Sequence, residues 1–241
     1  MIHLAESLAI HSVEGFLTPD EVANLTDVMD ELLGARGPET YGAGRTATMH
    51  EVPGLRPEEA MAVYEPDGRV EVSELPGSAE TLLQKAASRA MPTIAWVLPS
   101  VTSLRPWTYV EYGPGQHITP HADGIALDPM SWPRQIAGIS VVVETAACGG
   151  GFYVETTSDE RIWSPQRDTA EAGYEAGMRI ANDGADNSSK WFRELRRTRW
   201  TVNPGVGCAI IYGSQLVHGT DPVGEGRARK FISWFVAERQ E

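Results

Sequence analysis

The chain has 241 residues, of which 41% are hydrophobic and 22% are charged, and its formal net charge is −13. This length and composition indicate a globular protein that can fold without disulfides, and one domain over 1–241 is favoured over two. The acidic balance disfavours nucleic acid and anionic membrane surfaces as partners, because both carry negative charge.

Two features bear on the compartment. The chain has two cysteines, Cys148 and Cys208, far apart and outside any CxxC pair, and buried reduced thiols are favoured over a disulfide. The first residues lack the basic and apolar stretches of a signal peptide. No run approaches the roughly 18 apolar residues of a membrane span. A cytoplasmic location is therefore expected.

Two helices are predicted in the first hundred residues. The first covers 18–34, opens with the capping box Thr18–Glu21 and carries apolar residues at helical spacing. Residues 35–77 are rich in Gly, Pro and charge and are interpreted as loops and short strands. A second helix begins near Ser78, and Pro92 is expected to end or kink it.

Strand-like runs dominate the second half of the chain. They cover 102–112, 136–144, 151–157, 201–212 and 230–237. Helices followed by strands predict a helical flank over about 13–99 and a β-sandwich or jelly-roll core over about 100–238. The polar, charged insertion at about 158–200 is long enough to be a functional lid or a disordered segment.

A short histidine motif contains candidate metal ligands. In a strand, His121 and Asp123 are two residues apart and point to the same face. His218 follows a later β-run, and two histidines with one carboxylate form the facial triad of non-haem Fe(II) oxygenases. An isolated HxD also occurs in proteins without a metal. His117, four residues before His121, is expected to be a surface or packing residue.

The surrounding motifs strengthen this interpretation, because the chain resembles the prolyl-4-hydroxylase-like branch of the 2-oxoglutarate and Fe(II)-dependent oxygenases. Five segments in family order carry the resemblance: Phe16–Glu21, Glu111–Asp123, Ser140–Gly151, Asn203–Tyr212 and His218–Val223. They look like the opening helix, the tyrosine and Gly-Pro-Gly-Gln turn before HxD, a strand with its Gly-Gly turn, the strand before the distal histidine, and that histidine with its Pro-Val turn.

The resemblance implies a double-stranded β-helix, a distorted jelly roll with the site in its mouth. It implies Fe(II) on His121, Asp123 and His218, with 2-oxoglutarate and O2 as cosubstrates. In that family, oxidative decarboxylation of 2-oxoglutarate yields succinate and CO2 and leads to hydroxylation of an unactivated C–H bond. A small molecule, an amino acid or a peptide-like intermediate is the expected substrate.

At the residues that would hold 2-oxoglutarate this chain departs from the family pattern, because Ala228 stands at the position of the family's basic residue. Its cosubstrate carboxylate needs a buried cation. Two registers of the last strand are possible, since a one-residue slip exchanges its faces. One places Ala228, Lys230, Ile232 and Trp234 inside; the other, which is preferred, places Arg229, Phe231, Ser233 and Phe235 inside. Arg229 and Ser233 are then the predicted anchor.

Three further residues bear on the cosubstrate site. Tyr112 has two equally favoured interpretations: its hydroxyl donates a hydrogen bond to 2-oxoglutarate, or its ring packs in the sheet. Arg227 is expected at the surface, and Arg134 is more often solvated than bound to substrate.

Other functions remain open from the sequence. The same iron chemistry supports desaturation, cyclisation or epoxidation. A cupin-like metal-binding protein without turnover is the alternative from another class. The basic residues after His218 favour the enzyme, because a non-catalytic cupin has no need for them.

Overall fold

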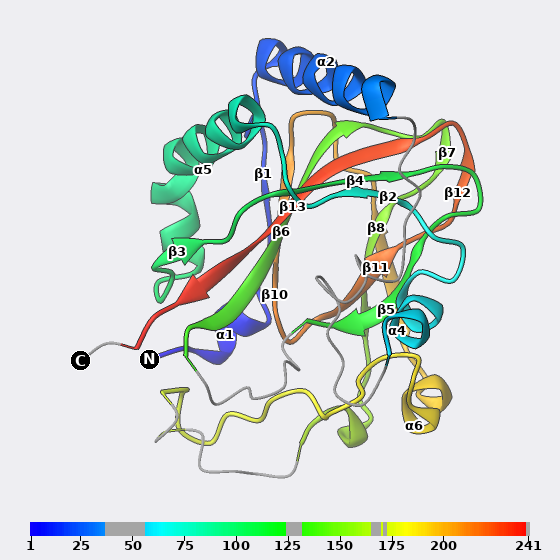
Figure 1. The fold of residues 1–241 in the computed structure, drawn as a ribbon. Helices are drawn as coiled ribbons and strands as arrows, with labels where there is room; N and C mark the ends of the chain where they lie inside the picture. The colour runs from blue at the N-terminus through cyan, green and yellow to red at the C-terminus, as the bar shows by residue number, and fades with distance from the viewer. Residues whose placement is uncertain (37–55, 124–131, 165–169, 171–172, 240–241) are drawn as a thin grey trace.

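The computed structural model describes residues 1–36, 56–123, 132–164, 170 and 173–239. Within these residues, antiparallel sheets form the centre of the molecule and the two long helices cover one side of it (Figure 1). The predicted fold, a β-helix core with a helical flank, is confirmed.

The helices of the described residues are α1 (Leu4–Ser7), α2 (Pro19–Arg36), α4 (Pro57–Tyr64), α5 (Gly77–Val97), a 3-10 turn (Glu160–Ile162) and α6 (Lys190–Glu194). The capping box predicted before α2 is present: the Thr18 amide donates to Glu21 Oε2 at 2.8 Å, and the Glu21 amide donates to Thr18 Oγ1 at 3.3 Å. Helix α4 was not predicted from the sequence.

Of the two outcomes expected at Pro92, an end or a kink, the end is excluded, since α5 runs through Pro92 to Val97. A proline inside a helix costs about 3 kcal/mol because it removes a backbone hydrogen bond. Ala87 and Ile94, on either side of Pro92, are both fully buried against the sheet. Packing on both sides of the proline therefore keeps the segment helical.

The larger sheet has the strand order β1-β10-β6-β13-β4-β2, and β3 pairs with β13 outside this order. Its strands are β1 (Ile10–Val13), β2 (Val70–Val72), β3 (Ser103–Leu104), β4 (Thr108–Tyr112), β6 (Arg134–Glu144), β10 (Ala209–Gly213) and β13 (Ala228–Ala237). The last of these strands is central, since it pairs with both β4 and β6.

The smaller sheet has the order β5-β11-β8-β9, and β7 pairs with β12 beside it. Its strands are β5 (Ile118–Ala122), β8 (Phe152–Thr156), β9 (Thr198–Val202) and β11 (Val217–Thr220), and the separate pair is β7 (Cys148–Gly149) with β12 (Val223–Glu225). The single run predicted over 201–212 is wrong. A turn containing Pro204 and Gly207, whose φ is 82°, carries the chain from one sheet to the other.

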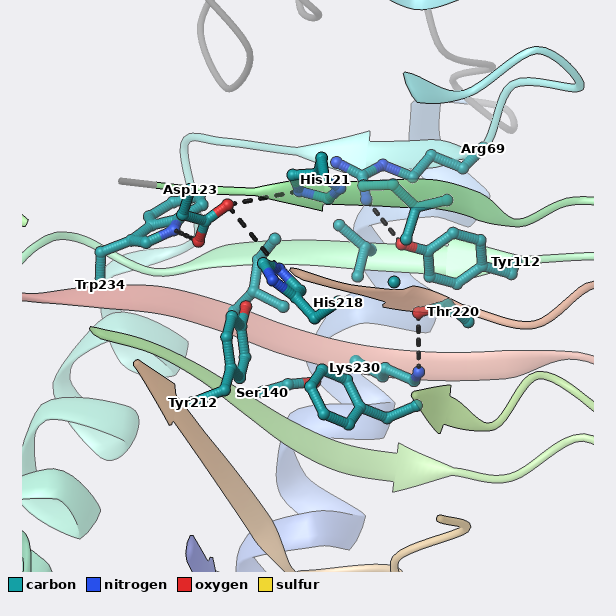
Figure 2. Close-up of a pocket in the computed structure, with 15 residues that line it drawn as sticks. Arg69, Tyr112, His121, Asp123, Ser140, Tyr212, His218, Thr220, Lys230 and Trp234 are labelled. Atoms are coloured by element: carbon teal, nitrogen blue, oxygen red, sulfur yellow. Dashed lines mark hydrogen bonds and ion pairs between the residues drawn. The ribbon is translucent and has the colours of Figure 1, made fainter. Parts of the chain in front are cut away.

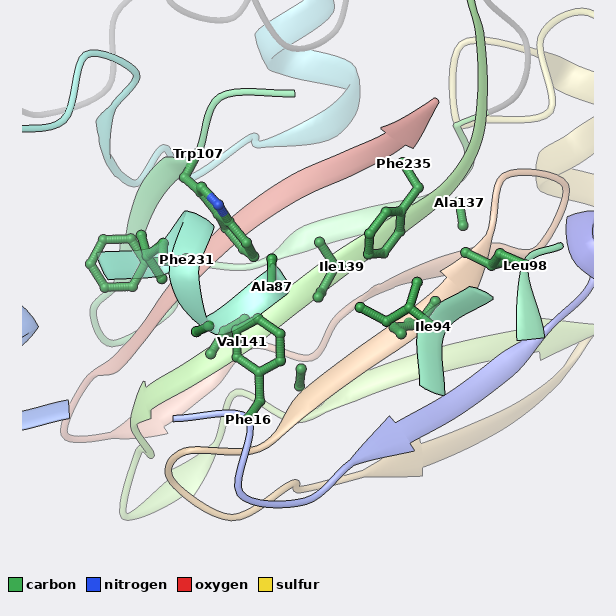
Figure 3. Packing of buried hydrophobic residues seen from close by; sticks show 14 of the residues in the cluster. Phe16, Ala87, Ile94, Leu98, Trp107, Ala137, Ile139, Val141, Phe231 and Phe235 are labelled. Atoms are coloured by element: carbon green, nitrogen blue, oxygen red, sulfur yellow. The ribbon is translucent and has the colours of Figure 1, made fainter. Parts of the chain in front are cut away.

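The main hydrophobic core lies between helices α2 and α5 and one face of the larger sheet (Figure 3). Phe231 and Phe235 of β13 and Ile139 of β6 are fully buried there. Burying a side chain of this size stabilises the fold by about 1.5–3 kcal/mol. The opposite face of the same strands is therefore available to line a pocket.

This core decides which face of β13 points inward. Because Phe231 and Phe235 face the helices, Arg229 and Ser233 lie on that side as well. Lys230, Ile232 and Trp234 line the pocket instead. The preferred register is wrong, and the other register considered from the sequence is the observed one.

The expectations for the cysteines and for membrane-spanning segments can be compared with the structure. Both cysteines are free thiols, but Cys148 is exposed, so the prediction that both are buried is wrong. In the part of the chain that the structure describes, no helix is both long enough and apolar enough to cross a membrane.

Candidate metal centre and pocket

The two candidate histidine ligands lie directly opposite each other on neighbouring strands. His121 of β5 and His218 of β11 are register partners, and their ring centroids are 4.5 Å apart. Both imidazoles are buried, with 3% and 5% of their residue surface exposed. Strand pairing alone therefore brings two distant parts of the sequence to one point.

Asp123, the residue directly after β5, completes the cluster. Its Oδ1 lies 3.3 Å from His121 Nε2 and 3.7 Å from His218 Nε2. One ligand atom from each of the three residues lies within 4.8 Å of the other two. The indole of Trp234 on β13 donates to Asp123 Oδ2 at 2.9 Å, which fixes the carboxylate. The predicted triad therefore converges on a single site.

Hydrogen bonds between Nδ1 and backbone carbonyl oxygens fix the orientation and the tautomer of both imidazoles. His121 Nδ1 lies 2.8 Å from the Thr119 carbonyl oxygen, and His218 Nδ1 lies 3.0 Å from that of Leu216. Carbonyls only accept, so Nδ1 carries the proton and Nε2 keeps its lone pair for a metal. Burial lowers the pKa of His218 to about 4, which keeps its imidazole neutral. This donor set fits a divalent iron ion.

A pocket of about 430 Å³, partly open to solvent, continues from the triad into the β-helix. Figure 2 shows Asp123 and Trp234 at one end of the view and Lys230 with Thr220 at the other. The walls of the pocket also include the apolar and aromatic side chains of Ile118, Phe152, Tyr212 and Ile232. An elongated ligand with polar groups at both ends suits this shape.

Lys230 supplies a cation deep in this pocket. It is 5% exposed, and its ammonium donates to the Gly150 carbonyl at 3.3 Å and to Thr220 Oγ1 at 3.4 Å. Burial, followed by repulsion from Arg69, lowers the pKa of Lys230 to about 8. A buried ammonium with two long neutral contacts is poised to receive a carboxylate, so the pocket fits a dicarboxylate such as 2-oxoglutarate.

The other predicted anchor residues lie elsewhere. Arg229 points to the helix side, where its Nη2 donates to Asp30 of α2 at 2.7 Å and its Nε donates to the Tyr109 hydroxyl at 2.6 Å. Ser233 Oγ donates to the Arg105 carbonyl at 2.7 Å. Neither of these two side chains lines the pocket. Tyr112, in contrast, lies in the pocket wall near Lys230.

The two remaining arginines are also outside the pocket. Arg227 pairs with Glu144 at 3.0 Å, and 44% of its side chain is exposed, as expected for a surface residue. Arg134 stacks over the rings of Trp132 and Tyr174, at 4.2 and 4.5 Å from their centroids. It is 3% exposed, so the solvated position expected for Arg134 is wrong.

No protein-family model and no curated protein sequence matches this chain. Solved structures match it well. A Pseudomonas putida prolyl-4-hydroxylase superposes with a TM-score of 0.57 at 17% identity, over 97% of this chain and 94% of that one. The collagen prolyl hydroxylase of Paramecium bursaria Chlorella virus-1, in its 2-oxoglutarate complex, gives 0.53 at 14%, over 97% and 99%. The epimerase SnoN, in complex with Fe3+, α-ketoglutarate and nogalamycin RO, gives 0.56 at 13%, over 96% and 80%.

The chain has the fold of the prolyl-4-hydroxylases. The resemblance found in the sequence is thus confirmed at the level of the fold, over nearly the whole chain. A hydroxylase and an epimerase share this fold, so the fold alone does not select the outcome of a reaction.

Sequence reasoning missed a group of residues behind the candidate metal centre. Tyr64 of α4 packs edge-on against His121, with 5.2 Å between ring centroids. Its hydroxyl donates to Asp186 Oδ2 at 2.6 Å, and Asp186 Oδ1 accepts from the Ser188 amide at 2.7 Å. These contacts join segments that are remote in sequence, and no local pattern announces them.

Asp186 belongs to the insertion at about 158–200, and it forms a β-bridge with the candidate ligand His121. The Ala122 amide donates to the Ala185 carbonyl at 3.2 Å, and Phe192 is buried in a small cluster with Ala122 and Val217. This part of the insertion packs on β5 and β11. A role for the whole insertion as a lid stays a prediction.

The contact between Tyr64 and Asp186 is expected to matter for stability. Tyr64→Phe removes a donor from a carboxylate that is 0% exposed. A buried acceptor that loses its partner costs about 1–3 kcal/mol, so urea denaturation should show a drop of that size. Tyr212→Phe is the matched control, because the Tyr212 hydroxyl lies at the pocket (Figure 2) and makes no hydrogen bond with the described residues. Equal stability of the two variants would contradict the role given to Tyr64.

Proposed function

We propose that this chain is a non-haem Fe(II) dioxygenase that consumes 2-oxoglutarate and hydroxylates an unactivated C–H bond of a small molecule, an amino acid or a peptide-like intermediate. One observation carries the proposal: a His-Asp-His cluster and a buried ammonium lie in the same pocket. A prolyl-4-hydroxylase fold around these groups supports it.

The chain's own residues have separable tasks in this proposal. His121 and His218 offer Nε2 and Asp123 offers a carboxylate oxygen to iron, which leaves other coordination positions for cosubstrate and oxygen. With iron bound, 2-oxoglutarate supplies oxidative decarboxylation that activates O2. Lys230 binds the distal carboxylate of the cosubstrate, and the apolar walls exclude water from the reacting atoms.

A non-catalytic metal-binding role is disfavoured by Lys230. Burying an ammonium is costly, and a protein that only holds a metal gains nothing from one in the same pocket. Other oxidative outcomes use the same residues, and the epimerase SnoN has the same fold. Hydroxylation is preferred because the structures of two prolyl hydroxylases resemble the chain over almost its full length.

The deciding experiment measures products. Purified protein with Fe(II), 2-oxoglutarate and O2 is screened against candidate metabolites and peptides for stimulated release of succinate. The reaction balances as 2-oxoglutarate plus O2 plus R–H giving succinate, CO2 and R–OH. Succinate release with one equivalent of hydroxylated product supports the proposal, whereas an unsaturated, cyclised or epimerised product supports the other outcomes. The absence of succinate with every compound would refute it.

The pH dependence of 2-oxoglutarate binding follows from Lys230. Its pKa is lowered to about 8, so the ammonium is present below pH 8 and is lost in the free protein above it. Arg69 and Asp221 are the charged groups that act on it. The dissociation constant of 2-oxoglutarate should therefore rise with pH above about 8, by at most roughly tenfold per unit.

Calorimetry in buffers of different ionisation enthalpy checks this directly. Binding at pH 9 should take up close to one proton, because the bound carboxylate recharges Lys230, and binding at pH 6.5 should take up almost none. The same proton uptake in Lys230→Met would show that another group titrates.

A further inference from the structure

Arg69 is a second buried cation at the pocket, and it lies outside every segment that resembles the known family. It follows the turn at Gly68 and precedes β2, and it is 1% exposed. Its Nη2 lies 3.0 Å from Glu65 and 3.0 Å from Glu71, both of which are fully buried. Two carboxylates therefore hold the guanidinium and balance its charge.

The same guanidinium contacts the Tyr112 hydroxyl. Arg69 Nη1 donates to Tyr112 Oη at 2.6 Å, and both side chains line the pocket (Figure 2). Burial raises the pKa of Tyr112, with Arg69 opposing, so the phenol keeps its proton at neutral pH. Guanidinium groups only donate, and the Tyr112 hydroxyl accepts here. Its own hydrogen must therefore point elsewhere.

That hydrogen has no acceptor within the described part of the chain. Tyr112 makes no other side-chain hydrogen bond there, although it is only 3% exposed. A buried hydroxyl usually uses its donor. Lys230 Nζ lies 5.6 Å from the centroid of the Tyr112 ring. A phenolic donor and an ammonium thus flank the same part of the pocket, which is an arrangement for an anion.

We propose that Arg69 is a positioning residue that turns the Tyr112 hydroxyl into a donor to the distal carboxylate of 2-oxoglutarate. This inference rests on the proposed function. Arg69 does not itself serve as the anchor, because Glu65 and Glu71 already match its charge. Arg69 acts by donating a hydrogen bond to the Tyr112 hydroxyl oxygen. The hydroxyl hydrogen then has one direction left in which it can donate.

The test uses two single variants and their combination. Tyr112→Phe removes the donor. Arg69→Lys keeps the positive charge for Glu65 and Glu71, but an ammonium lacks the planar fork that reaches both carboxylates and Tyr112 together. The protein is loaded with Mn(II), which does not turn over, and the dissociation constant of 2-oxoglutarate is measured by calorimetry.

Each single variant is expected to bind 2-oxoglutarate about tenfold more weakly than the wild type, the loss typical of one charged hydrogen bond. The double variant should bind no more weakly than Tyr112→Phe alone, because Arg69 acts only through that hydroxyl. If the two fold-increases in the dissociation constant multiply in the double variant, the inference is overturned. An unchanged dissociation constant in Arg69→Lys would overturn it as well. General damage to the fold would also multiply, so it cannot imitate the expected result.

A second ligand separates this inference from the proposed function. 2-Oxopentanoate has a methyl group where 2-oxoglutarate has its distal carboxylate. The preference of the wild type for 2-oxoglutarate over 2-oxopentanoate should shrink about tenfold in both Arg69→Lys and Tyr112→Phe. An unchanged preference in Arg69→Lys refutes the positioning role alone. A wild-type protein that binds neither ligand refutes the proposed function and the inference with it.

Discussion

The variants His121→Ala and His218→Ala are each expected to lose all measurable turnover. Only two ligands would remain in either variant, and two ligands hold iron poorly. Addition of Fe(II) and 2-oxoglutarate without oxygen should give a visible charge-transfer band in the wild type and none in the variants. A band of unchanged strength in both variants would remove the ligand assignment.

His117→Ala is the matched control for this experiment. It removes an imidazole from the same stretch of chain, but the His117 ring lies near Asp67, with 3.3 Å between Nδ1 and Oδ2, and does not line the pocket. It should keep both the band and the activity. Loss of the band in His117→Ala would mean that the whole segment tolerates no change, and that the ligand variants report on folding.

The second large effect is expected at Lys230. Lys230→Ala should raise the dissociation constant of 2-oxoglutarate roughly tenfold to hundredfold, since a charged hydrogen bond contributes about 1.5–3 kcal/mol. Binding is measured by calorimetry with Mn(II) present, so that catalysis does not interfere. Little or no weakening would show that the cosubstrate is anchored elsewhere.

Arg229→Ala is the neighbouring control, and it should behave differently. Arg229 is fully buried among Tyr109, Asp30 and Glu144 on the helix side of the sheet. Its removal should lower the free energy of unfolding by about 1–3 kcal/mol and leave 2-oxoglutarate binding within about twofold. Weaker binding in Arg229→Ala but not in Lys230→Ala would restore the anchor first predicted from the sequence.

The candidate metal centre could be predicted because the pattern that identifies it is local. His121 and Asp123 are two residues apart, and the alternation of a strand places them on one face whatever the rest of the fold does. The third candidate ligand, His218, was predicted from its position after a β-run. The pairing of β5 with β11 then sets His218 opposite His121. Period-two spacing and motif order were sufficient for this part of the site.

The proposed 2-oxoglutarate anchor, Lys230, could not be predicted because both faces of β13 carry a cation. The turn before β13 leaves the register open, and only the partners of each face decide it. Helices α2 and α5 need bulky apolar residues beneath them, which assigns Phe231 and Phe235 to that side. Asp30 on α2 then pairs with Arg229. The apolar face of the predicted first helix was the available signal, and it favours the observed register.

Other parts of the site depend on contacts that leave no trace in a local pattern. Arg69 lies in a stretch that was interpreted as loops and short strands, and its role appears only through Tyr112 and two carboxylates. Tyr64 and Asp186 meet behind His121 from elements on either side of it in the chain. Thr220 could have been predicted from the sequence, because it is two residues after His218 on the same strand and therefore points to the same face.

The central place of β13 in the larger sheet has a consequence for biosynthesis. β13 pairs with β4 and β6, and β10 pairs with β1, so most strand partners are remote in the chain and the fold must form slowly. On the ribosome, His121 and Asp123 emerge long before Trp234 and Lys230. Until β13 has emerged, the edges of β4 and β6 lack the strand that pairs with both and are open to other partners. The pocket, which Lys230 and Trp234 of β13 help to line, is therefore complete only after β13 has paired with β4 and β6.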